Sequence, residues 1–202
     1  MTGRTTPAGL VGLDLGAQLW ERVFHVAPLV LVGTREAGGF DLAPKHMAMP
    51  LGHDGFFCFA CTPRHATYWN AKDHGAFTVS FPTPDQVVQT SMAASGREGE
   101  GRKRGLAALD TFPATTVDGV LVAGCPLHLE CELDRIVDGF GDASLVVGKI
   151  VAALADEQAL ALEDADPADV LHRAPLLAYV SPGRFARVAD TLSFPFPADF
   201  SR

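Results

Sequence analysis

The strongest structural constraint in this sequence is a stretch in which apolar and polar side chains alternate. Residues 127–134 read LHLECELD, so leucines and a cysteine occupy the odd positions, while histidine, glutamates and an aspartate occupy the even ones. A two-residue period places successive side chains on opposite faces of a strand. The sequence therefore predicts a strand with one buried and one solvated face, which is typical of an antiparallel sheet.

The residues that follow predict a partner for this strand. Residues 139–142 read GFGD, a turn sequence, and residues 145–154 are apolar and rich in β-branched side chains. Two such runs across a short turn predict an antiparallel hairpin. Further strands are expected at 29–34, 56–61, 77–81, 176–180 and 184–188, and helices at 17–25, 66–74, 84–94 and 166–172. Many short strands with few helices favour a mainly β fold, an antiparallel barrel with connecting helices.

Composition restricts the functions that this chain can have. Its 202 residues are 48% hydrophobic and 20% charged, which is typical of a folded globular chain, and we expect a single domain over residues 1–202. The formal net charge of −8 and the lack of a sustained basic run argue against nucleic-acid binding. The sequence has no run of 18 apolar residues and no export-signal pattern. We therefore expect a cytoplasmic protein without membrane contact.

The four cysteines raise the question of a metal or redox site. Cys58 and Cys61 form a C-x-x-C pair, which occurs in dithiol redox sites and as half of a zinc site. Within the predicted strand 56–61, however, an offset of three places the two side chains on opposite faces. Cys125 and Cys131 are not spaced as a second zinc-binding pair. We expect no metal site and interpret all four as small buried hydrophobic side chains, with a metal or dithiol site as the alternative.

The first candidate binding segment is residues 43–50, which read APKHMAMP. The segment follows neither the helix nor the strand period, and its prolines predict an irregular, stiff segment with unpaired backbone N–H groups. Such donors suit the carbonyl oxygens and ring nitrogens of a flavin, and Met47 and Met49 can lie against its ring. The alternative is a structural loop that carries a surface lysine and histidine.

The second candidate segment is residues 61–67, CTPRHAT, which leave one predicted strand and enter the predicted helix 66–74. A helix N-terminus offers free N–H groups and a partial positive charge, which suits a phosphate. Thr62 and Thr67 add hydroxyl donors, and Arg64 adds a planar cation that can bind two oxygens. The alternative is that Thr67 only caps the helix. Together the two segments describe a site with a ring end and a phosphate end.

A third segment is polar and glycine-rich. Residues 96–105 read GREGEGRKRG, with four basic and two acidic side chains. We interpret this segment as a mobile surface loop, and the alternative is a contact with a ligand.

The order of these features resembles the flavin-reductase-like family of FMN-binding split barrels. The matching features are Ala43-Pro44, Arg64, Thr67-Tyr68-Trp69-Asn70, Gly75-Ala76-Phe77-Thr78-Val79 and the later strand pair across Gly141-Asp142. The resemblance covers residues 25–155, leaves 156–202 as a C-terminal extension, and depends on the order of the motifs rather than on one specific motif. It implies a closed antiparallel Greek-key split β-barrel that forms a homodimer, with FMN near the dimer interface.

The resemblance also implies roles for individual residues. The segment 45–49 would face the isoalloxazine ring, and the 62–67 segment would hold the phosphate. Members often carry a histidine just after the Gly-Asp turn, on the nicotinamide side of the site, where this chain has Ala143. His46 is the candidate catalytic residue in its place, and a surface histidine is the alternative. The expected cofactor contacts are Lys45, His46, Met47, Ala48, Met49, Cys61, Thr62, Arg64 and Thr67.

The function implied by the resemblance is that of an FMN-dependent oxidoreductase, an NAD(P)H:flavin reductase. Hydride would pass from the nicotinamide to the flavin, which either stays bound or leaves for a partner monooxygenase. Two alternatives remain open. One is a non-catalytic FMN-binding electron carrier or flavin-storage protein, and the other is a related split barrel that acts on pyridoxine phosphates or haem.

Overall fold

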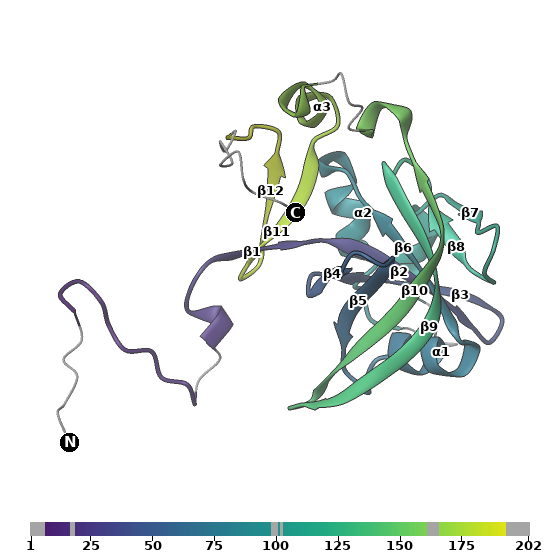
Figure 1. Ribbon diagram of the computed structural model, residues 1–202. Coiled ribbons are helices and arrows are strands. Elements are labelled where there is room, and N and C mark those ends of the chain that lie inside the picture. Colours follow the sequence, from purple (N-terminus) through teal and green to yellow (C-terminus); the bar gives the residue numbers. More distant parts are fainter. Residues whose placement is uncertain (1–6, 17–18, 98–100, 102, 161–165, 193–202) are drawn as a thin grey trace.

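The computed structural model describes residues 7–16, 19–97, 101, 103–160 and 166–192. Its largest unit is an antiparallel sheet of seven strands, which confirms the expectation of a mainly β fold (Figure 1). In spatial order the strands are β3 (Gly39–Lys45), β2 (Val30–Glu36), β6 (Ala76–Phe81), β9 (Leu127–Phe140), β10 (Ala143–Ala155), β5 (Phe56–Cys61) and β4 (Ala48–Leu51).

Smaller elements surround this sheet. β1 (His25–Pro28), β11 (Leu176–Ser181) and β12 (Arg184–Val188) form a second sheet, and β7 (Thr111–Pro113) pairs with β8 (Val120–Val122). The helices are α1 (Ala66–His74), α2 (Val87–Met92) and α3 (Pro167–Arg173), with 3₁₀ turns at Leu19–Glu21, Pro84–Gln86, Arg104–Ala108 and Glu157–Ala159. In the described part of the chain, no helix is long and apolar enough to cross a membrane.

The main core packs the aromatic side chains of β5 against those of β6. Phe57, Phe59 and Phe77 are each at most 1% exposed, and the rings of Phe59 and Phe77 meet edge to face at 5.1 Å. Gly148 of β10 makes this packing possible, because a Cβ at that position would lie 2.5 Å from the ring of Phe77. β5 and β6 thus supply the three largest fully buried side chains of the described structure.

The predicted hairpin is confirmed as β9 and β10, but the second face of β9 is solvated only in part, since Glu132 and Asp134 are exposed as the alternation predicted and the two polar residues before them are buried. His128 is 7% exposed and Glu130 is 1% exposed. The hairpin β7–β8 and its loop cover this face, and the Glu130 carboxylate accepts hydrogen bonds from the backbone N–H groups of Thr115, Thr116 and Val117. Burial alone would raise the pKa of Glu130, but these donors outweigh it and the pKa lies below its ordinary value. Glu130 can be buried here because the loop between β7 and β8 donates hydrogen bonds to its carboxylate.

The expectation of a closed barrel is met only in part. The sheet is curled, and its two edge strands, β3 and β4, are joined by the short connection His46-Met47 (Figure 1). Among the described residues, no strand ladder pairs β3 with β4. The structure therefore shows a curled half-barrel rather than a barrel closed by strand pairing.

The prediction of an irregular segment at 43–50 is wrong. β3 continues through Lys45, and β4 begins at Ala48. Pro44 pairs with Leu31 in this arrangement. A proline cannot donate to a strand ladder, but β3 and β4 are both edge strands, where one side of the strand needs no donor. The edge position therefore permits regular strands in a segment whose prolines predict an irregular conformation.

The predicted helix 17–25 is also wrong. Of the residues described there, Leu19–Glu21 form a single 3₁₀ turn, and His25 begins β1, which pairs with β11. Residues 17 and 18 lie outside the described residues. Figure 1 shows this N-terminal arm extending away from the body of the molecule. An amphipathic segment without a surface to pack against gains too little to form a helix of this length.

The predicted helix 66–74 is confirmed as α1 and contributes directly to the candidate site. It ends at Gly75, which has a φ of 68° and provides the left-handed conformation that terminates the helix. His65 occupies the N-cap position, so the alternative that Thr67 caps the helix is not what the structure shows. Thr67 is instead buried in the first turn. The predicted helices at 84–94 and 166–172 correspond to a 3₁₀ turn followed by α2, and to α3.

Candidate functional site

A cavity of about 560 Å³ lies at the N-terminus of α1. Its walls come from the end of β3, the first turn of α1 and the segment that follows α2. Three of the predicted cofactor contacts line it, Lys45, Arg64 and Thr67. The complete lining is Asp41, Ala43, Pro44, Lys45, Arg64, His65, Ala66, Thr67, Ala93, Ala94, Ser95, Gly96, Arg97 and Lys103. The volume is in the range of small-molecule sites.

Two cations in this lining, Arg97 and Lys103, converge on one buried carboxylate. Lys103 Nζ lies 2.9 Å from Asp41 Oδ1, and Arg97 Nη2 lies 3.3 Å from Asp41 Oδ2. Arg97 also donates to the Glu36 carboxylate at 2.7 Å, and this hydrogen bond raises the pKa of the guanidinium. The carboxylates of Asp41 and Glu36 hold both cations at the cavity wall, whereas Arg64 is paired with Asp142.

Positive charges surround His65 in the lining of this cavity. Its pKa lies below the ordinary value, first because burial disfavours the imidazolium and then because of the positive charges of Lys45, Lys103 and Arg64. His65 also sits at the N-cap of α1, where the helix dipole adds positive potential. The cavity therefore favours an anion over a cation.

Sequence reasoning missed Arg97 and Lys103. Both belong to the segment 96–105, for which we expect a mobile surface loop or, as the alternative, a contact with a ligand; in the structure Gly96, Arg97 and Lys103 line this cavity. Residues 98–100 and 102 lie outside the described residues. The basic character of the segment was the available signal, but nothing local indicated that Asp41, on another strand, would bind it.

The three predicted phosphate contacts, Thr62, Arg64 and Thr67, are divided between this cavity and a neighbouring one. Thr62 lines a second cavity of about 480 Å³, together with Trp69, Asp142 and Ala143. Arg64 lines both cavities and forms an ion pair with Asp142 at the tip of the β9–β10 hairpin, and its side chain is 73% exposed. The structure thus brings Arg64 and Thr67 together at one cavity, while Thr62 faces the adjoining one.

Residues 45–49, which are predicted to face the flavin ring, differ in burial and in the groups that they contact. Lys45 is 8% exposed, lines the first cavity and donates to Cys61 Sγ at 3.4 Å. Ala48 is buried in the main core, whereas Met47 and Met49 are each 51% exposed. Cys61, another predicted cofactor contact, is buried and its sulfur contacts Lys45. Only Lys45 of this group lines the anion-favouring cavity.

His46 lies against the C-terminal part of the chain. Its ring stacks on Tyr179 of β11 with the centroids 4.4 Å apart, and its Nδ1 atom is buried without a hydrogen-bond partner. The pKa of His46 lies below its ordinary value because burial disfavours the imidazolium, and the charges of His25 and Lys45 act in the same direction. His46 is therefore mainly neutral at neutral pH.

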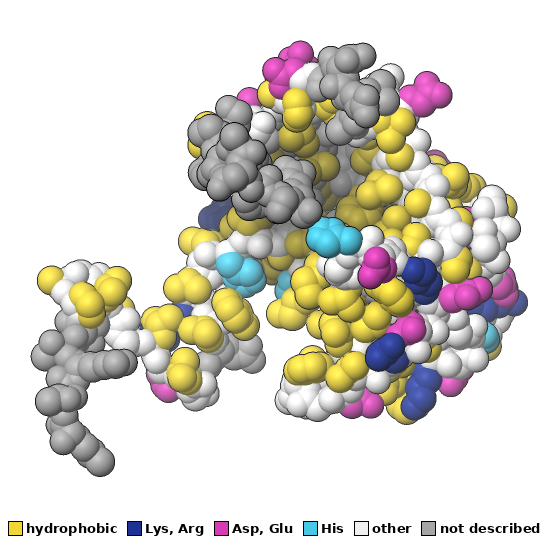
Figure 2. Space-filling model, in the orientation of Figure 1, with side chains coloured by type: hydrophobic (Ala, Val, Ile, Leu, Met, Phe, Trp, Pro, Cys, Tyr) yellow, Lys and Arg dark blue, Asp and Glu magenta, His cyan; other side chains and the backbone are white. Residues whose placement is uncertain are grey.

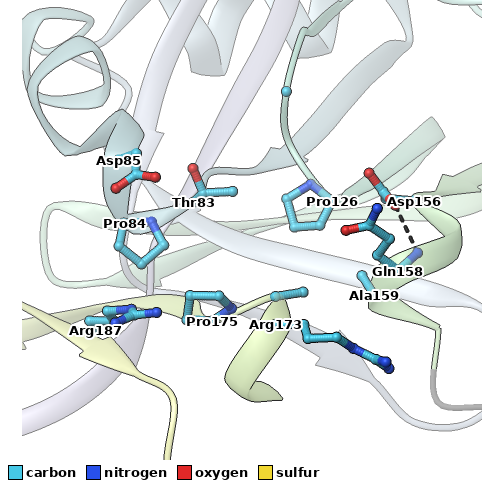
Figure 3. Close-up of a pocket in the computed structure, with 12 residues that line it drawn as sticks. Thr83, Pro84, Asp85, Pro126, Asp156, Gln158, Ala159, Arg173, Pro175 and Arg187 are labelled. Carbon is cyan, nitrogen blue, oxygen red and sulfur yellow. Dashed lines mark hydrogen bonds between the residues drawn. The ribbon is translucent and has the colours of Figure 1, made fainter. Parts of the chain in front are cut away.

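A further cavity of about 470 Å³ lies between α3, β12 and the turn before α2 (Figure 3). It contains two arginines, but Figure 3 shows Arg173 extending away from Arg187 and Asp85. Its charged groups do not converge on one point, and none of the predicted site residues lines it. Within the described residues there is also no group of three or more side chains placed to hold a metal ion.

The comparison with known families decides the classification. The family model described as flavin reductase like domain matches residues 23–179, which is most of the chain. The chain belongs to this family. The match continues beyond residue 155 and ends within β11, so residues 156–179 of the predicted C-terminal extension lie inside the matched region. No curated protein matches the sequence.

Solved structures support the fold of this flavin-reductase-like chain. A flavoredoxin from Methanosarcina acetivorans is similar with a TM-score of 0.77 and 19% identity, covering 95% of this chain and 97% of that one. Nitrilotriacetate monooxygenase component B from Bacillus cereus gives 0.78 and 16%, covering 93% and 100%. An FMN-binding protein from Thermus thermophilus with bound p-hydroxybenzaldehyde gives 0.69 and 22%, covering 96% and 100%. At these identities the likeness concerns the fold.

Proposed function

We propose that this flavin-reductase-like chain is an FMN-binding oxidoreductase whose FMN phosphate occupies the cavity at the N-terminus of α1. The observation that carries the proposal is the convergence of Lys45, Arg97 and Lys103 on a cavity that also receives the first turn of a helix. A phosphate carries close to two negative charges and three acceptor oxygens. Helix N-terminal N–H groups together with lysine and arginine side chains are the donors that such a group requires.

The ring of the flavin would extend from this cavity along the connection between β3 and β4. Lys45 ends β3 and lines the cavity, so the residues immediately after it are the nearest part of that connection. Met47 and Met49 are half-exposed and offer polarizable apolar surface, which suits an aromatic ring. The predicted ring contacts thus follow directly along the chain from the proposed phosphate contacts. FMN supplies the electron-transfer chemistry, and the protein orients it and excludes water.

The activity that we propose is reduction of this flavin by NAD(P)H. His46 is the candidate proton carrier, because it is held by Tyr179 next to Lys45 and is mainly neutral at neutral pH. The alternative, an electron carrier or flavin-storage protein, is supported by the similarity to a flavoredoxin. A partner monooxygenase is supported by the similarity to a monooxygenase component B.

The test is anaerobic mixing of the purified protein with FMN and NADH or NADPH. Loss of the visible absorbance of oxidised flavin, faster than in a protein-free control, is the expected result. Tight FMN binding without this loss would favour the electron carrier or storage protein. A matched titration with riboflavin, which lacks the phosphate, tests the cavity itself, since equal affinity for both ligands would contradict the proposed phosphate site.

We also propose that two copies of the chain associate. The N-terminal arm exposes Leu10, Val11 and Phe24, which are 64%, 83% and 69% exposed. Figure 2 shows apolar side chains over this arm and over the neighbouring face of the body. A monomer rarely leaves this much apolar surface in water, and a second copy would cover the arm and the half-exposed methionines together.

A further inference from the structure

The side chains of Lys45 and Cys61 form a polar contact at the wall of the anion-favouring cavity, and Cys61 Sγ also donates to the Thr62 carbonyl at 3.7 Å. Lys45 Nζ lies 3.4 Å from Cys61 Sγ, and the two residues are 8% and 4% exposed. Lys45 ends β3 and Cys61 ends β5, so the contact joins two strands that are far apart in the sheet order. Lys45 lines the cavity, and Cys61 contacts Lys45 without being part of the lining.

The other cysteines lack such a neighbour in the described structure. Burial raises the pKa of Cys125 and of Cys131 to about 12, and it raises the pKa of Cys58 as well. Cys125 donates to the side-chain oxygen of Gln86. Among the described contacts, Cys61 is the cysteine whose sulfur meets a side-chain amine, so it is the one at which nitrogen can capture an oxidised sulfur.

We propose that Cys61 and Lys45 form a reversible sulfur–nitrogen crosslink in response to hydrogen peroxide. The inference stands on the contact between the two side chains and does not require the proposed flavin site. In the first step the Cys61 thiol gives up its proton, its sulfur attacks one oxygen of the peroxide, the O–O bond breaks, and sulfur loses two electrons. The released hydroxide takes up a proton and leaves as water, so that Cys61 becomes a sulfenic acid.

In the second step the Lys45 amine attacks the oxidised sulfur. The Lys45 ammonium first releases one proton to water, which leaves a neutral amine as the nucleophile. The N–S bond forms, the S–O bond breaks, and the hydroxyl leaves with a proton from nitrogen as a second water. One thiol, one amine and one peroxide thus become one crosslink and two waters. A sulfenic acid is known to condense with a nitrogen in this way.

The crosslink would have a consequence for the cavity. It neutralises Lys45, one of the cations that make the cavity favour anions. If FMN binds there as proposed, the oxidised protein would hold it more weakly, and thiol reduction would restore binding. This consequence depends on the proposed function, whereas formation of the crosslink does not.

The test treats the purified flavin-free protein with hydrogen peroxide and analyses it by mass spectrometry. The expected product has lost the mass of two hydrogens, and its proteolysis yields one peptide that joins Lys45 to Cys61. Trypsin should no longer cleave after Lys45, and dithiothreitol should restore both the original mass and the cleavage. Cys58→Ser is the matched control, since it alters the same strand and should leave the crosslink intact.

The variant Lys45→Met separates the two steps. Without the amine, peroxide should leave a sulfenic acid at Cys61 that a β-diketone reagent such as dimedone traps, whereas the wild-type protein should resist trapping. Three outcomes would overturn the proposal: an unreactive Cys61, equal trapping in the wild type and the variant, or a joined peptide that contains an additional oxygen. Because the readout is covalent mass, it does not depend on flavin binding or turnover.

Discussion

Lys103 Nζ lies 2.9 Å from the carboxylate of Asp41, a side chain that is only 2% exposed. This contact fixes one end of the glycine-rich segment to the wall of the candidate site. A buried carboxylate that loses one cation keeps part of its desolvation cost without the compensating attraction. Arg97 also contacts Asp41, so the loss on removing Lys103 is partial.

We expect Lys103→Met to lower the free energy of unfolding by about 1–3 kcal/mol, the cost of leaving a buried charged group short of a partner. Urea denaturation at neutral pH measures this change. Arg135→Met is the control, because Arg135 pairs with Asp134 at the surface, with its own side chain 69% exposed, and such pairs contribute little. Equal unfolding midpoints for the Lys103 variant and the wild type would show that the buried pair is not important for stability.

The two arginines of the cavity should differ in their effect on FMN. Arg97 is held by two carboxylates at the cavity wall, whereas Arg64 is largely exposed and also pairs with Asp142. We expect both Arg97→Ala and Arg64→Ala to weaken FMN more than riboflavin. A full charge-assisted contact corresponds to about 1.5–3 kcal/mol, or about tenfold to 150-fold in affinity.

Fluorescence titration of FMN and riboflavin against both variants measures these losses. The loss for Arg97→Ala should be the larger of the two, because Arg97 is already oriented before the ligand binds. Parallel losses for the two ligands would mean that neither guanidinium contacts the phosphate.

Folding stability should fall as the pH is lowered through the histidine range. The pKa values of His46 and His128 are lowered in the folded protein, in both cases first by burial. The unfolded chain therefore binds protons at these residues before the folded protein does, starting at about pH 6.5. Stability is then lost as the pH falls from about 6.5 toward the lowered folded values.

Urea denaturation across this pH range measures the slope. His128→Asn should reduce it, because one of the groups that takes up protons only on unfolding is removed. His74→Asn serves as the comparison, since His74 is exposed in the last turn of α1. A slope that is the same in the wild type and the His128 variant would exclude His128 as a source of the pH dependence.

The role of His46 can be read from the pH dependence of the reductase rate. If His46 carries a proton during turnover, His46→Gln should remove the titration of the rate that lies below the ordinary histidine pKa. Tyr179→Leu removes the stacking partner and keeps the imidazole, so it should shift this titration and not abolish it. Stopped-flow flavin reduction as a function of pH gives both profiles. Identical profiles for the wild type and the His46 variant would assign His46 a packing role only.

The N-terminal arm should contribute to association of two copies. We expect Trp20→Ala and Phe24→Ala to weaken the dimer by about 2 kcal/mol each, as for truncated aromatic contacts at protein interfaces. Light scattering over a concentration series measures the association. Leu192→Ala is the control, because Leu192 is 98% exposed and lies far from the arm in the sequence. A wild-type chain that remains monomeric at all concentrations would refute the association itself.

Local pattern predicted much of the fold correctly. The strand 56–61, the hairpin that begins at residue 127 and the helix that ends at Gly75 all appear as predicted. Each is determined by an interaction within a few residues, either a hydrophobic period or the left-handed conformation of a glycine. The classification as a flavin-reductase-like chain also came from the order of such local elements, and the family match confirms it.

The tertiary structure determines which other segments these elements contact. Pro44 lies in a regular strand because that strand is at the edge of the sheet, and Glu130 is buried because a distant loop donates three N–H groups to it. Arg97 and Lys103 reach the candidate site through Asp41, which lies on another element. Hydrophobic periodicity and turn residues predict the conformation of a segment and of its immediate neighbours in the sequence. Edge position, burial of a polar group and convergence of charges depend on segments far apart in the sequence, and only the folded chain brings those together.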